Sequence, residues 1–312
     1  MQTGRALLAL ILGVQAVGCA ASPAVPAPAA TPPAAPSSPP RVATAESCQA
    51  PYCRLFDTPE AAFSEVLKSA PRILAVGEFH ALKSHKGLKS PVARFTDTLV
   101  PMLAETASDI VIEYWVGTGQ CPQQEKEVVR EQRPVTQSHA ESTPNEFLRL
   151  GDQAKARGIR PHPLTVTCED YQRILKAGDE SVREMLVLTA RMFSSNAKLY
   201  FQRNQAIGAE KTIVTYSGAM HNDLRPDHAC GEPCSFGKEL ETLAAGRYVE
   251  LDLVVPEYIH DGPVWRERVW YPHFDRQAFH PKTTLFNPYP GSYVLIFPST
   301  AGWKPEAQSP SR

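Results

Sequence analysis

The stretch from Arg72 to Ala81, RILAVGEFHA, decides both the expected fold and the expected site. Its apolar run, residues 73–76, is typical of a buried strand, and Gly77 follows it. If the strand continues, Glu78 and His80 leave the same face, because side-chain direction in a strand repeats every two residues. A carboxylate beside an imidazole suits metal binding or proton transfer. The alternative is that Gly77 ends the strand and a polar turn follows.

Strand-like and helix-like segments alternate around this stretch. The expected strands are residues 73–80, 109–115, 159–166, 212–217, 247–255 and 292–297, and the expected helices are 58–69, 91–107, 143–157, 180–210 and 236–245, with a short one near 125–131. This alternation predicts an α/β fold, with a mostly parallel central sheet and helices on both faces. Pro161 and Pro163 place the third strand at an edge or in an irregular position, since proline lacks the N–H that a central strand needs.

Titratable residues fall at the ends of several expected strands. Glu78 and His80 end the first strand, Glu113 lies near the end of the second, and His221 follows the fourth. Ligand sites in open parallel sheets form beyond the carboxyl ends of the strands. The sequence therefore predicts that the four side chains share one site. The alternatives are an exposed charge for Glu113 and a cap or core histidine for His221.

The overall composition is that of an ordinary globular protein. The chain has 312 residues, is 43% hydrophobic and 21% charged, and carries a net charge of -1. No basic run or nucleic-acid motif is present, so we expect no nucleic-acid partner. We assign one globular domain to residues 47–300, which is long enough for a sizeable core, and a disordered tail to 301–312.

The amino terminus has the layout of an export signal. Arg5 precedes an apolar run at residues 6–14, and small residues lead to Cys19. The tetrapeptide Ala16-Val17-Gly18-Cys19 resembles the bacterial lipoprotein cleavage box, which implies a signal peptide at residues 1–18 and lipidation of Cys19. A plain signal peptide is the alternative. Residues 19–46 are proline-rich and predict an extended linker, so we expect an exported protein, held by lipid in the bacterial cell envelope at the outer membrane.

The cysteine count also favours export. Of seven cysteines, lipidation of Cys19 would leave six, an even set that suits three disulfides in an oxidising compartment. We expect the pairs Cys48 with Cys53, Cys121 with Cys168, and Cys230 with Cys234. The alternative is zinc at the CGEPC pair, although no second pair of the usual zinc-ribbon spacing is present.

Taken together, these motifs resemble a known superfamily. They are GEFH at residues 77–80, the strand carboxylate Glu113, and the run RNQAIGAEKTIVTYSGAMH that ends at His221. Over roughly residues 72–257 the chain is similar to the superfamily that joins erythromycin esterases, ChaN-like haem-uptake lipoproteins and the TIKI/TraB proteases. The lipoprotein leader is especially like the ChaN branch.

Carried over residue by residue, the resemblance implies a site made by Glu78, His80, Glu113, Arg203 and His221. Arg203 lies little more than a turn from the end of its expected helix, nearer the amino end of the next strand than the site, so either the helix crosses the sheet obliquely or Arg203 is structural. The esterase branch implies a histidine acting as base on water, helped by the carboxylates and the arginine. The TIKI/TraB branch implies a divalent metal such as Mn or Co, and the ChaN branch implies haem binding without chemistry. The element around His221 reads AMHN, where the esterase branch has His-Asn-x-His.

The first function to test is a hydrolase acting on a small-molecule or peptide substrate. In it, His80, Glu113 and His221 hold Mn, Co or Zn or orient a water, and His80 or Glu78 takes the proton. No G-x-S-x-G, H-E-x-x-H or P-loop motif is present, so activated water is the simplest nucleophile.

The second function is a haem-binding lipoprotein without catalysis, and a third is a structural envelope lipoprotein with a vestigial site. Haem binding is favoured by the stretch 260–293, which is rich in aromatic residues and histidines. The residues concerned are Trp265, Trp270, Tyr271, His273, Phe274, His280, Phe286 and Tyr289. The same stretch could instead be a proline-rich cover for the last strands.

Overall fold

The computed structural model describes residues 46–48, 51–226, 229–275 and 281–302. All of them fall within the compact unit Val42–Arg312. The expected signal peptide, Cys19, nearly all of the linker and residues 303–312 of the tail lie outside the described residues. In the described part, no helix combines the length and the apolar character needed to cross a membrane.

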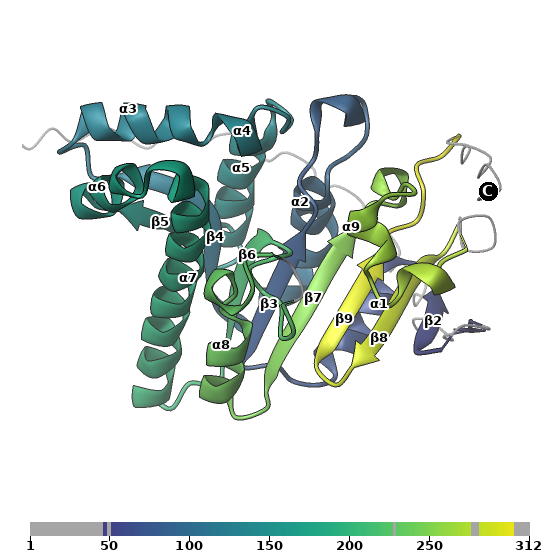
Figure 1. Ribbon diagram of the computed structural model, residues 1–312. Helices are drawn as coiled ribbons and strands as arrows, with labels where there is room; N and C mark the ends of the chain where they lie inside the picture. Colours follow the sequence, from purple (N-terminus) through teal and green to yellow (C-terminus); the bar gives the residue numbers. More distant parts are fainter. Residues whose placement is uncertain (1–45, 49–50, 227–228, 276–280, 303–312) are drawn as a thin grey trace, which may run out of the picture. The chain divides into compact units, whose positions relative to one another are not determined.

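The described residues form a nine-stranded sheet in the order β1-β2-β8-β9-β7-β3-β6-β4-β5 (Figure 1). The strands are β1 (Glu46–Ser47), β2 (Cys53–Phe56), β3 (Ile73–Glu78), β4 (Ala107–Gly117), β5 (Arg160–Val166), β6 (Thr212–Gly218), β7 (Tyr248–Val254), β8 (Thr283–Tyr289) and β9 (Ser292–Ile296). All neighbours from β9 to β5 pair in parallel, so the expected mostly parallel sheet is confirmed. The antiparallel pairs of β1, β2, β8 and β9 were not expected.

Helices cover both faces of the sheet, as the sequence predicted (Figure 1). The α-helices are α1 (Pro59–Leu67), α2 (Pro91–Arg94), α3 (Pro122–Glu131), α4 (Arg133–Thr136), α5 (Thr143–Lys155), α6 (Cys168–Lys176), α7 (Ser181–Ala206), α8 (Gly237–Ala244) and α9 (Pro263–Arg266). Leu74 and Val76 of β3 pack into a core with α1, α2 and α5, whereas Ile73 and Ala75 pack into a second core with α7 and α8.

Prolines set several local features. The helix expected over residues 91–107 stops being α-helical at Arg94 and continues as a π-helix and a 3-10 helix to Leu103. Pro101 lies in this irregular part, where its missing N–H and its ring are incompatible with a regular α-helix interior. The strand that carries Pro161 and Pro163 is β5, and it lies at the edge of the sheet as expected.

The three expected disulfides are confirmed. They join Cys48 to Cys53, Cys121 to Cys168, and Cys230 to Cys234. The second ties the segment after β4 to the start of α6. The third closes a short loop after β6, which matters for the site described below.

Strands β3 and β6 are neighbours, yet the chain leaves them toward opposite faces. After β3 it continues to α2, which packs on the first core, and after β6 it continues to α8, which packs on the second. Such a divergence leaves a crevice at the carboxyl ends of the two strands. The fold therefore provides a place for a ligand where Glu78 and His80 lie.

Candidate functional site

A cavity of about 830 Å³ opens at the carboxyl ends of β3, β4 and β6. Glu78 ends β3, His80 follows it, Glu113 belongs to β4 and His221 follows β6, and all four line this cavity. The structure therefore brings together four of the five site residues that the sequence singled out.

Glu78 and His80 form a tight pair. His80 Nδ1 lies 2.8 Å from Glu78 Oε1, and the Tyr216 hydroxyl donates to Glu78 Oε2 at 2.5 Å. The carboxylate is thus held from both sides and is only 2% exposed. Burial lowers the pKa of His80, but the hydrogen bond to Glu78 and the charges of Glu78 and Glu113 outweigh it and raise that pKa to about 9. At neutral pH His80 is an imidazolium.

Glu113 and His221 form a second, looser pair. Glu113 Oε2 accepts a hydrogen bond of 2.6 Å from the Gly218 N–H, and Glu113 Oε1 lies 3.8 Å from His221 Nε2. The other ring nitrogen of His221, Nδ1, lies 2.7 Å from the Cys234 carbonyl oxygen. A carbonyl oxygen only accepts, so Nδ1 donates its hydrogen to it, and Nε2 is the ring nitrogen that faces Glu113.

Gly218 lies between the two pairs. A Cβ atom at this position would be 3.1 Å from His80 Nε2 and 3.6 Å from Glu113 Oε2. The glycine therefore lets an imidazole of one pair and the carboxylate of the other approach the same point of β6. Since Nδ1 of His80 is held by Glu78, the ring presents Nε2 to this side.

A largely apolar wall faces these polar groups. It comes from the end of β4, the segment around α4 and α5, and α7, and includes Trp115, Val135, Phe147, Met185 and Leu186. The wall and the two carboxylate–imidazole pairs make a cavity that can hold an apolar group next to a polar reacting centre.

His139 is a cavity residue that sequence reasoning missed. Its ring centre lies 4.9 Å from that of His80, because the backbone of Ser138 and Ala140 pairs with Lys83 and Ala81. Burial and the nearby charge of His80 lower the pKa of His139. The sequence around His139 has no strand or helix pattern that would place it at the site, so the residue type was the only available signal.

The structure does not bring Arg203 to the cavity. Arg203 lies near the end of α7 and donates to Asp109 Oδ2 at 2.5 Å, close to the beginning of β4. Asp109 is fully buried and also binds Arg160 and His162. The reason is topological: α7 runs back along the sheet, so its last turn reaches the amino ends of the strands. We therefore leave Arg203 out of the candidate site.

The aromatic stretch that favoured haem packs mainly on itself and on the sheet. Trp265 and Trp270 are 3% and 4% exposed, and Trp265 lies 4.4 Å from Phe79 between ring centres. Trp270 packs beside Phe286 of β8 at 5.9 Å. This is the arrangement of a cover over the last strands. Residues 276–280, with His280 among them, lie outside the described residues.

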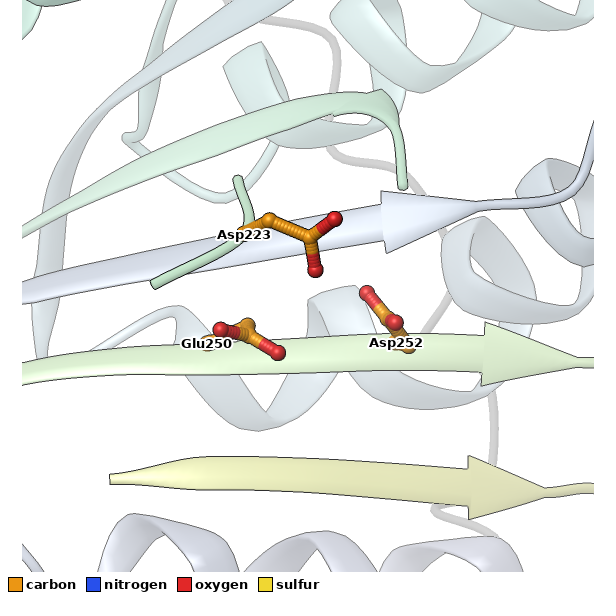
Figure 2. A group of neighbouring side chains, drawn as sticks. All are labelled: Asp223, Glu250 and Asp252. Atoms are coloured by element: carbon orange, nitrogen blue, oxygen red, sulfur yellow. The ribbon is translucent and has the colours of Figure 1, made fainter. Parts of the chain in front are cut away.

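A second polar cluster, which we call the acidic cluster, consists of Asp223, Glu250 and Asp252 (Figure 2). Among the described residues it is the only set of three His, Cys, Asp or Glu side chains whose donor atoms all lie within 4.8 Å of one another. His80, Glu113 and His221 do not form such a set in this arrangement. The three residues proposed as metal ligands thus do not converge as a three-donor site.

The acidic cluster was not expected from the sequence. Glu250 and Asp252 alternate with apolar residues in β7, and both are at most 6% exposed. Burial raises the pKa of both carboxyl groups, and the charge of Asp252 raises that of Glu250 further. Two acidic residues spaced by two in an otherwise buried strand were the available signal.

No protein-family model matches the sequence, and no curated protein matches it. Among solved structures, that of the type III effector HopBA1 is similar to this chain at 12% sequence identity and a TM-score of 0.36. The match covers 77% of this chain and 94% of that chain. We draw no argument about activity from a likeness of this size.

Proposed function

We propose that this protein is a hydrolase that activates a water molecule to cleave an ester or peptide bond. The observation that supports it best is that two carboxylate–imidazole pairs share one cavity, with Nδ1 of each histidine held by a different partner. His80 is held as an imidazolium by Glu78. In the proposed reaction His221, whose Nδ1–H is donated to the Cys234 carbonyl, enters as the neutral imidazole and accepts a proton at Nε2. An acid and a base next to one another are what hydrolysis at neutral pH requires.

His221 acts as the base in this proposal. A water held between Glu113 Oε1 and His221 Nε2, which lie 3.8 Å apart, gives its proton to Nε2 as its oxygen attacks the substrate carbonyl. The Cys234 carbonyl and the charge of Glu113 stabilise the imidazolium that forms. The same proton then passes to the leaving oxygen or nitrogen as the tetrahedral intermediate collapses.

His80 stabilises the negative charge that develops on the substrate oxygen. Its Nε2–H points to the Gly218 side of the cavity, and its positive charge is maintained by Glu78. A charged donor that is already in place contributes most where charge appears only in the transition state. This reverses the sequence-based hypothesis in which His80 or Glu78 takes the proton of water.

The proposal uses no metal at His80, Glu113 and His221, because their donor atoms do not converge and His80 Nδ1 is already bound to Glu78. We keep, as part of the proposal, an exported protein held in the cell envelope by a lipid on Cys19. The three disulfides support an oxidising compartment.

The test is a panel of p-nitrophenyl esters and chromogenic peptides, assayed with the full-length protein in chelator. We expect turnover of at least one class, and a loss of at least about 100-fold in kcat for His221→Gln. A haemin titration of the same protein tests the alternative. A bound haem spectrum with no turnover on any substrate would reject the hydrolase proposal.

A further inference from the structure

The acidic cluster lies on the α8 side of the sheet, apart from the reaction proposed above. Glu250 and Asp252 of β7 are paired in register with Ala75 and Gly77 of β3, and Asp223 follows β6. All three residues are at most 6% exposed. Figure 2 shows the carboxylates of the cluster turned toward a shared space beside β7.

Three buried carboxylates close together carry a charge that is costly unless it is compensated. Arg268 lies beside the cluster, with Nη1 4.0 Å from Asp223 Oδ2, and Arg225 and Lys238 line the same cavity. Protons, these basic groups or a bound cation can supply the compensation.

Asn222 provides an independent observation that favours a cation. Its side chain is fully buried, and Nδ2 donates to the Ala75 carbonyl and to Asp252 Oδ1. Among the residues that the structure describes, its Oδ1 has no hydrogen-bond partner. A Cβ atom on Gly77 would be 2.6 Å from both Asn222 Oδ1 and Asp252 Oδ1, so the two oxygens lie over the same point of β3. A buried amide oxygen left unsatisfied beside a carboxylate is suited to ligate a metal.

We propose that the acidic cluster binds a hard divalent cation, of the Ca²⁺, Mg²⁺ or Mn²⁺ class, through its three carboxylates and Asn222 Oδ1. All four donors are oxygens, which this class prefers. An ion can reach them through a cavity of about 730 Å³ that is lined by the three carboxylates. Asn222 and Asp223 directly follow His221, so a bound ion would also hold the segment that carries this histidine.

Metal binding by the full-length protein tests this directly, with no need for a substrate. After dialysis against chelator and its removal, CaCl₂, MgCl₂ and MnCl₂ are titrated separately by calorimetry, and Tm is measured with and without each metal. We expect saturable binding of at least one ion and, at about 100 times its Kd, a rise in Tm of roughly 5 °C. Glu250→Gln and Asp252→Asn should each weaken that binding at least about 10-fold, since each removes a charged ligand.

Glu241→Gln is the matched control, because Glu241 lines the same cavity but is not part of the acidic cluster. It should keep the affinity of the unchanged protein. Both cluster variants keep the size of the side chain, and their Tm in chelator shows whether they fold. If no ion binds at roughly 10 mM, weaker than ordinary extracellular calcium modules, protons neutralise the cluster and the proposal is overturned. Equal binding by the cluster variants and the control would also overturn it.

Discussion

The two ends of the sheet each contain a histidine bound to a carboxylate, at the same distance. At the carboxyl ends of the strands, His80 Nδ1 lies 2.8 Å from Glu78, and at the amino ends His162 Nε2 lies 2.8 Å from Asp109. Asp109 also receives Arg160 and Arg203, and it is fully enclosed. Glu78 instead receives a tyrosine hydroxyl, and its histidine borders a large cavity beside a second carboxylate.

This difference shows that the pair itself does not make a reactive site. The guanidinium groups of Arg160 and Arg203 compensate the charge of Asp109, and these ion pairs hold β4, β5 and α7 together. Around Glu78 the counter-charge is His80 itself, and that charge faces the cavity. Charge balance and access, rather than the contact, separate a catalytic pair from a structural one.

The largest expected effect is on activity and comes from substituting the two histidines in parallel. His80→Gln should lower kcat on the best ester or peptide substrate by about 100-fold or more, because the charged donor to the developing oxyanion is lost. His162→Gln should leave kcat within about twofold, since His162 lies at the other end of the sheet. Both are measured by initial rates under saturating substrate. Equal losses in the two variants would mean that the carboxyl-end pair has no special role.

The second expected effect is on stability, and we expect it at the amino-end pair rather than at the carboxyl-end pair. Asp109→Asn should lower the free energy of unfolding by roughly 3 kcal/mol, because it leaves two arginines without their buried anion. This lies at the lower end of the usual range, since both arginine side chains are partly exposed and can be hydrated. Urea unfolding at pH 7 measures it. Hydrogen bonds to His162, Arg160, Ser108 and Arg203 outweigh burial and hold the pKa of Asp109 well below its ordinary value of 3.8.

That depressed pKa gives the stability prediction its own check. A carboxylate of this kind contributes stability that is present above pH 3.8 and is lost as the pH falls toward its folded pKa. The difference between the unchanged protein and Asp109→Asn should therefore shrink below pH 3.8. A difference that stays constant with pH would point to repacking rather than to charge.

Much of the central sheet could be predicted from the sequence, and its antiparallel edge could not. β3, β4, β6 and β7 are largely buried strands rich in apolar residues and separated by helices, a pattern that indicates parallel strands. By contrast, β8 lies in a stretch full of prolines and aromatics, and β1 and β2 are only two and four residues long. The turn at Pro290 and Gly291 was the one local sign of a hairpin between β8 and β9.

The candidate site was predictable where residues end strands and not where helices or loops bring them in. Glu78, Glu113 and His221 could be grouped because parallel strands end at one edge. The resemblance placed Arg203 in the site, whereas its position near the end of its expected helix put it closer to the amino end of the next strand, and there the structure has it, near the end of the 26-residue α7. His139 came from a loop whose pairing with residues 81–83 has no pattern in the sequence.

The third prediction concerns pH and sharpens the comparison between the pairs. Because the pKa of His80 is raised to about 9 mainly by Glu78 acting against burial, activity should fall as the pH rises through about 9. The stability that His80 contributes has the same sign: it is fully present below about pH 6.5 and is lost as the pH rises through about 9. In Glu78→Gln the alkaline limb of the kcat profile should move to lower pH. An unchanged limb would show that another group titrates there.

The smallest expected effect separates the geometry of the site from its charges. Gly218→Ala adds one methyl group 3.1 Å from His80 Nε2, close enough to displace the ring by a few tenths of an ångström without removing any titratable group. We expect roughly a 10-fold loss of kcat, since small misplacements of catalytic groups are costly, with little change in KM. Gly151→Ala is the matched control: it adds the same methyl in α5 at an ordinary contact distance of 3.6 Å from Pro161. It should stabilise the helix by about 0.5–1 kcal/mol and leave kcat unchanged. If Gly218→Ala were as active as Gly151→Ala, the position of His80 would not limit the reaction, and only its charge could.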